Sequence, residues 1–198
     1  MKRMVVLWLP LLLGVATARA MDVNLVAVDY RDGAYTLELD AVVEVPEARA
    51  RALLTDYANL GRINPSIEES EILEDNDGEG LRVRTVTRVC VWFYCKRVTQ
   101  VQDVSVGWDR SVTATLIPEL SDFSFGWARL HLWQQPNGTR VLIRSELAPD
   151  FWIPPLIGHW LIKRKLRSEA LETIGRMEKV GKGADAFPNT HENSKDKP

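Results

Sequence analysis

The chain has 198 residues, 45% of them hydrophobic, and a formal net charge of -2. This length and composition suit one domain with a substantial core. The negative charge argues against nucleic acid as a partner, because binding a phosphate backbone takes an excess of lysine and arginine.

Residues 1–20 have the features of a secretory signal peptide. Lys2 and Arg3 form a basic start, an apolar run follows over 4–14, and residues 18–20 match a small-x-small cleavage site. The uncharged stretch is shorter than the roughly 20 residues that a membrane-spanning helix needs, although an uncleaved anchor is the alternative. We therefore expect a periplasmic or secreted protein.

The next residues predict a strand, a second strand and two short helices. Residues 23–30 suit a short strand and 31–33 a turn. Apolar and polar side chains then alternate over 35–45, which is typical of a half-buried strand. Short helices are expected at 47–54 and near 57–63, the second ending before an Asn-Pro pair.

The middle of the chain predicts only strands. Six are expected, at 67–73, 81–90, 94–104, 108–117, 125–134 and 140–147. Their hairpin-length connections predict an antiparallel sheet. The acidic loop over 74–80 lacks the spaced ligands and the closing glutamate of a calcium loop, so we interpret it as a solvated turn.

The last apolar segment, 154–180, predicts one helix of about 40 Å. Its prolines at 154 and 155 suit a helix start, and Gly181 and Gly183 suit its end. Apolar residues recur three to four positions apart and form one stripe: Leu156, Trp160, Leu166, Ala170, Leu171, Ile174 and Met177.

A lone long helix must bury its stripe, and the sheet is the available partner. The predicted fold class is therefore α+β, of the helix-grip kind. A curved antiparallel sheet of about six to eight strands surrounds the long C-terminal helix, and two short helices follow the first main strand.

This order of elements resembles the START-like superfamily, also called the SRPBCC or polyketide cyclase/dehydrase group. The resemblance covers about residues 35–180 and is strongest at Leu-Thr-Asp-Tyr over 54–57 and Asn-Pro at 64–65. Similar motifs occur in coenzyme Q-binding and lipid-transport members. The resemblance implies an apolar cavity for a lipid, quinone, sterol or polyketide-like molecule, and it implies no family-wide catalytic residues.

Three parts of the chain are then expected. Residues 1–20 are the signal peptide, residues 21–181 the START-like ligand-binding domain, and residues 182–198 a disordered tail, because they are polar and interrupted by proline.

Cys90 and Cys95 are the only cysteines, and they flank the tip of a predicted hairpin. If residues 92–93 form the turn, the two cysteines lie opposite each other, so a disulfide is expected in an exported protein. The Cys-x4-Cys spacing is poor for zinc, so no metal site is predicted. A redox-active pair would lack the usual Cys-x-x-Cys helix start.

Two proline-containing loops, 117–125 and 149–155, carry large apolar side chains. Such groups on a loop usually have a partner, and in START-like folds the corresponding segments frame the cavity mouth. Packing against the end of the sheet is the alternative. The expected ligand-binding residues are Phe123, Phe125, Trp127, Phe151, Trp152, Ile153, Leu156 and Trp160.

Several charged or titratable groups leave two interpretations open. His131 and His159 lack any catalytic spacing but could meet in space. The alternating arginines at 82, 84 and 88 suit a solvated face, whereas an inward arginine would select an anionic head group. The basic run 163–165 suits a solvated helix face or transient contact with an anionic membrane surface.

We predict from these features an exported protein that binds or carries a hydrophobic small molecule, with no cofactor and no catalytic residue. A second hypothesis is a cyclase/dehydrase- or hydrolase-like enzyme that uses the same cavity, with His131 or His159 as the candidate acid or base. A third is an envelope adaptor that binds a protein through its aromatic loops.

Overall fold

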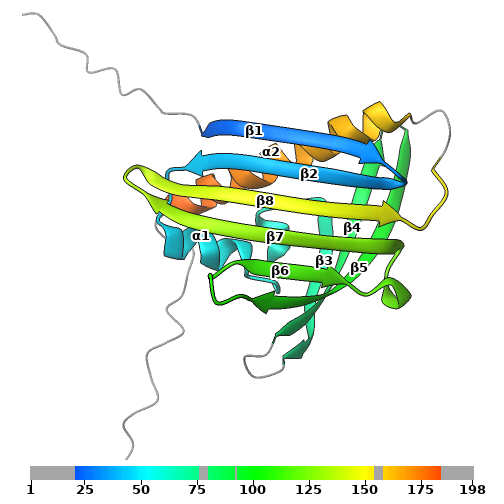
Figure 1. Ribbon diagram of the computed structural model, residues 1–198, viewed down its shortest axis with the longest axis horizontal. Coiled ribbons are helices and arrows are strands. Elements are labelled where there is room, and N and C mark those ends of the chain that lie inside the picture. The colour runs from blue at the N-terminus through cyan, green and yellow to red at the C-terminus, as the bar shows by residue number, and fades with distance from the viewer. Residues whose placement is uncertain (1–20, 76–79, 92, 154–157, 184–198) are drawn as a thin grey trace, which may run out of the picture.

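The computed structural model describes residues 21–75, 80–91, 93–153 and 158–183 (Figure 1). The predicted signal peptide, the tail beyond residue 183 and most of the acidic loop lie outside these residues. Eight antiparallel strands form one sheet in the described chain, and a short and a long α-helix accompany it. The α+β helix-grip prediction is therefore confirmed.

Every strand of the sheet pairs antiparallel with its neighbours, in the order β1-β2-β8-β7-β6-β5-β4-β3. Strands β3, β4 and β5 cross the others at a steep angle, so the sheet curls around the long helix (Figure 1). The strands are β1 Asp22–Arg31, β2 Ala34–Val43, β3 Ile67–Asp75, β4 Leu81–Val91, β5 Tyr94–Val106, β6 Val112–Leu116, β7 Phe123–Gln135 and β8 Gly138–Pro149.

The helices differ from the expected ones at two places. The α-helix α1 spans Glu47–Leu54 as predicted, but the second short helix is only a 3₁₀ turn, η1 Leu60–Arg62. A second 3₁₀ turn, η2 Pro118–Leu120, joins β6 to β7. The long helix α2 spans His159–Lys182, and the predicted start at the two prolines lies outside the described residues.

The strand predicted over 108–117 begins later, at Val112. Its first residues form a turn in which Asp109 accepts hydrogen bonds from the amide and hydroxyl of Ser111 at 3.0 and 2.7 Å. Trp108 is 99% exposed on this turn. An aromatic residue after a turn signal suits the start of a strand, but local aspartate–serine hydrogen bonding overrides that preference here.

The two ends of α2 are buried to different degrees. Ile174 and Met177 are fully buried against Leu39, Val43 and Val141 of the sheet. Trp160, which the stripe also includes, is 62% exposed. The expectation that the sheet buries the whole stripe is therefore wrong at Trp160, because only the C-terminal half of the helix packs in the main core.

Gly181 is part of helix α2 and does not end it. A Cβ at this position would lie 2.6 and 2.8 Å from the two Cγ atoms of Val45, a fully buried residue. Glycine therefore lets the helix backbone rest directly on Val45. At Gly175, on an earlier turn of the same helix, the corresponding Cβ position has no atom within 4 Å from the rest of the described chain, beyond the adjoining residues and helix backbone.

We expect opposite effects from the same substitution at these two glycines. Gly181→Ala should destabilise the protein by about 1–3 kcal/mol, because a buried β-branched side chain cannot move aside easily. Gly175→Ala should stabilise it by roughly 0.5–1 kcal/mol, because alanine loses less backbone entropy in a helix. Urea unfolding of both variants measures the difference, and equal effects would contradict the close approach at Gly181.

A partly buried ion pair joins β2 to β8 on the outer face of the sheet. Arg140 donates two hydrogen bonds to the carboxylate of Asp40, at 3.0 and 2.6 Å, and Asn24 donates a third at 3.2 Å. The guanidinium of Arg140 holds the pKa of the Asp40 carboxyl below its usual value, although burial of Asp40 opposes this.

This lowered pKa predicts an acid-dependent loss of stability. A carboxyl whose pKa is depressed by folding stabilises the folded state above its ordinary pKa, and that contribution falls as pH drops through the folded pKa. Asp40→Asn should therefore lower stability at neutral pH, and the difference from wild type should shrink below about pH 4. Urea midpoints measured at several pH values test this; a constant difference would contradict it.

Candidate ligand-binding cavity

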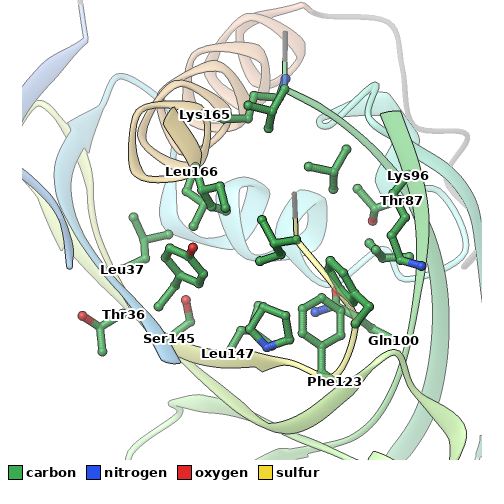
Figure 2. A pocket seen from close by; sticks show the side chains of 18 of the residues that line it. Thr36, Leu37, Thr87, Lys96, Gln100, Phe123, Ser145, Leu147, Lys165 and Leu166 are labelled. Carbon is green, nitrogen blue, oxygen red and sulfur yellow. The ribbon is translucent and has the colours of Figure 1, made fainter. Parts of the chain in front are cut away.

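A cavity of about 250 Å³ lies between the concave face of the sheet and the N-terminal half of α2 (Figure 2). Strands β2, β4, β5, β7 and β8, the segment after β8 and helix α2 all contribute to its lining. Helix α2 contributes Ile162, Lys165 and Leu166. Most of the lining is apolar. Apolar lining side chains of the sheet and of the segment after β8 include Val89, Val98, Phe123, Leu147 and Phe151.

The β4–β5 hairpin forms one wall of the cavity. Val89 and Val91 of β4, and Lys96 and Val98 of β5, belong to its inner face. Cys90 pairs with Cys95 in the strand register and is joined to it by a disulfide, as the sequence predicts. The disulfide therefore fastens the two strands together directly beside the lining residues.

A register shift in β7 decides which of its aromatic side chains reach the cavity. The pairing with β8 is irregular between Phe123 and Phe125, so the alternation changes phase there. Phe123 is buried and lines the cavity, whereas Phe125 is 49% exposed. The inner face of β7 continues with Gly126 and Ala128, which lie opposite the lining residues Leu147 and Ser145 of β8.

Three of the eight predicted ligand-binding residues line this cavity: Phe123, Phe151 and Ile153. Phe151 packs edge-on against Phe123, with ring centroids 5.8 Å apart. Their contact with a ligand remains a prediction.

The other predicted residues lie elsewhere. Phe125 and Trp127 are turned to the outer face of the sheet, where Trp127 Nε1 donates a hydrogen bond of 3.2 Å to Glu146. Trp152, at 70% exposure, and Trp160 project into solvent next to lining segments. Leu156 lies outside the described residues.

Most polar residues of the lining are absent from the predicted set. They come from inner-face positions of four strands and from the helix: Tyr35, Thr87, Lys96, Gln100, Ser145 and Lys165. The strand alternation was the available signal for Lys96 and Gln100, because both share a face with Val98.

Tyr35 and His159 are hydrogen-bonded at the edge of the cavity, with 2.8 Å between the Tyr35 hydroxyl and His159 Nδ1. The imidazole also stacks on Tyr30, with ring centroids 3.7 Å apart. Burial, together with the charge that Tyr30 can carry, raises the pKa of Tyr35 to about 12. The phenol is therefore neutral at ordinary pH and serves as a hydrogen-bonding group.

His131 does not join this pair. It stacks on Trp133, with ring centroids 5.3 Å apart, and both belong to the outward register of β7. The hypothesis that His131 and His159 meet is therefore wrong, because the sheet separates them.

The arginines of β4 also lie on the outer face. Arg82 pairs with Asp103 at 2.8 Å and with Glu74, and Arg84 pairs with Glu71 at 2.8 Å. Arg88 lies 3.9 Å from Glu68. The solvated-face interpretation is therefore the correct one for this strand.

Two absences can be stated for the described part of the chain. It contains no group of three or more histidine, cysteine, aspartate or glutamate side chains that could hold a metal ion. None of its helices is both long and apolar enough to cross a membrane.

Comparison with known proteins identifies the fold. No protein-family model and no curated protein sequence matches the chain. Among solved structures, the Zhui aromatase/cyclase from Streptomyces is 14% identical, with a TM-score of 0.61 over 75% of this chain and 93% of that one.

Two further structures give the same picture. The START superfamily protein from Mycobacterium smegmatis is 17% identical, with a TM-score of 0.58 over 73% of this chain and 98% of that one. The STAR-related lipid transfer protein from Xanthomonas axonopodis is 12% identical, with a TM-score of 0.59 over 80% and 99%. These likenesses establish the START-like fold of the chain.

Proposed function

We propose that this protein binds a hydrophobic small molecule, such as a lipid, quinone or polyketide-like compound, and carries it without chemical change. The observation that supports this proposal is the apolar cavity between α2 and the sheet. The solved structures of the same fold include a lipid transfer protein and an aromatase/cyclase. A cavity of this kind suits a ligand with an extended apolar part.

Burial of the ligand would supply the affinity. Each buried CH₂ group contributes about 0.8 kcal/mol, so ten of them contribute on the order of 8 kcal/mol before the costs of association. This contribution to the binding free energy needs no catalytic group. The titratable phenol of Tyr35 stays protonated at neutral pH, which makes it a hydrogen-bonding group and a poor general base.

We also propose that the protein works outside the cytoplasm, in the periplasm or after secretion. The features of residues 1–20 support removal of a signal peptide before the domain that begins at residue 21. The Cys90–Cys95 disulfide supports an oxidising compartment.

The first test is mass spectrometry of an organic extract from protein purified out of its native compartment. We expect a lipid, quinone or related compound in near-stoichiometric amount. A protein that is empty, and that also fails to take up a fluorescent acyl probe, would contradict the carrier function and favour the enzyme and adaptor hypotheses.

Filling the cavity should abolish binding of such a probe. Ser145 lies on the inner face of β8 and points into the cavity (Figure 2). Ser145→Trp should weaken acyl-probe binding by about tenfold or more, because two excluded CH₂ groups already correspond to roughly that factor. Ser105→Trp, at an exposed serine of β5 outside the lining, is the matched control and should bind normally.

We further propose that the rim of the cavity contacts an anionic membrane surface during loading. Trp152 and Trp160 are exposed beside segments that line the cavity, and Lys163 and Arg164 follow on the helix. Exposed aromatic groups next to basic side chains suit insertion among anionic lipid head groups. Lys163 lies 3.6 Å from Asp29, an exposed pair that offers little resistance to such contact.

Removing both rim tryptophans should therefore reduce membrane binding. The double variant Trp152→Ala with Trp160→Ala should bind phosphatidylglycerol-containing vesicles about tenfold more weakly in a sedimentation assay, because it buries less aromatic surface. Trp108→Ala removes another exposed tryptophan, from the β5–β6 turn, and should have no effect. Equal losses in both variants would contradict a specific rim.

A further inference from the structure

The charged residues of the cavity lining are all basic. Lys96 of β5 and Lys165 of α2 line the cavity, and no aspartate or glutamate of the described chain does. The two lysines come from opposite walls, one from the sheet and one from the helix (Figure 2). Their local partners decide which of them is available to a ligand.

Lys165 already has an acidic partner. Its ammonium forms an ion pair with Glu169, one helical turn further along α2. The hydroxyl of Ser66 donates to both carboxylate oxygens of Glu169, at 2.8 and 3.0 Å. The charge of Lys165 is therefore neutralised within the protein.

Lys96 has no comparable partner among the described residues. It is half-buried and forms no ion pair or hydrogen bond with the described residues, and its ammonium makes a cation–π contact with Phe151, 4.8 Å from the ring centroid. The next residue, Arg97, is on the opposite face and pairs with Glu68 at 2.8 Å and with Glu69 at 2.6 Å. The acids of this region thus lie outside, and within the described chain the ammonium of Lys96 contacts the ring of Phe151 and no carboxylate.

Two neutral hydrogen-bonding side chains accompany Lys96 on the same wall. Gln100 lies on the same face of β5, four residues further on. Thr87 of β4 pairs with Val98, which makes it a diagonal neighbour of both Lys96 and Gln100. Figure 2 shows Lys96 and Thr87 side by side on this wall, with the apolar side chains of Leu37 and Leu166 on the other side of the cavity.

We propose that the ligand is an amphiphile with an anionic head group, a carboxylate or a phosphate, and that Lys96 binds this head group with Thr87 and Gln100 beside it. The inference rests on the proposed function and specifies the chemistry of its ligand. An ammonium in an apolar, half-buried wall forms a strong charge-assisted hydrogen bond with an anion. The apolar remainder of the ligand occupies the rest of the cavity.

Ligands that share one alkyl chain and differ in the head group test this assignment. Dodecanoate, dodecyl phosphate, dodecanol and dodecyltrimethylammonium are titrated by calorimetry into the protein that begins at residue 21, at concentrations below those at which they form micelles. We expect an anion to bind about tenfold or more tightly than dodecanol, and the cation to bind most weakly. The relative affinities of dodecanoate and dodecyl phosphate distinguish the two anionic head groups.

Variants of Lys96 separate its charge from its packing. Lys96→Met keeps most of the side-chain bulk and should remove the preference for the anion while leaving dodecanol binding within about twofold. Lys96→Arg should retain the preference. Lys179→Met, at an exposed lysine near the end of α2, changes the net charge equally and should leave the preference intact.

The possible results separate the two proposals. Equal binding of the anions and dodecanol by the wild type would overturn the head-group assignment and leave the carrier function standing. A preference for the anions that persists in Lys96→Met would have the same consequence. Failure of all four compounds to bind would overturn the carrier function together with the inference that rests on it.

Discussion

The structure depends on the uneven packing of α2 against the sheet. Near its C-terminal end the helix backbone approaches Val45 closely at Gly181, and the neighbouring Ile174 and Met177 fill the core. At the N-terminal half, the residues that face the sheet border the cavity instead. One helix therefore has two roles, because its dense end supplies the stability that lets the other end cover a cavity.

Hydrophobic periodicity predicted the fold well, because that signal is local. The alternation over 35–45 and the three-to-four-residue repeat over 160–177 can each be recognised within one segment of the chain. The strand β2 and the helix α2 that they predict are both present. The periodicity did not predict burial correctly along helix α2, where one half of the helix packs in the core and the other half does not. Trp160 continues the stripe of Ile174 and Met177, yet the sequence contains no sign that the core ends between them.

The candidate site was harder to predict than the fold. Phe125 and Trp127 were predicted to bind the ligand together with Phe123, but the irregular pairing after Phe123 turns them outward. A bulge of this kind depends on how β7 pairs with β8, which the sequence of β7 alone does not show. Lys96 was missed for a different reason. In a sequence rich in exposed charge, an inward lysine looks like any other until the register of its strand is known.

The register of the β4–β5 hairpin also connects the disulfide to the composition of the cavity wall. A shift of one residue in β5 would exchange its two faces and would bring Arg97 inward in place of Lys96. Cys90 and Cys95 are paired beside this position, so their bond holds the alignment on which the face of Lys96 depends. The crosslink closes too short a loop to add much stability, roughly 2 kcal/mol. Its larger contribution is to fix which side chains of the β4–β5 wall line the cavity.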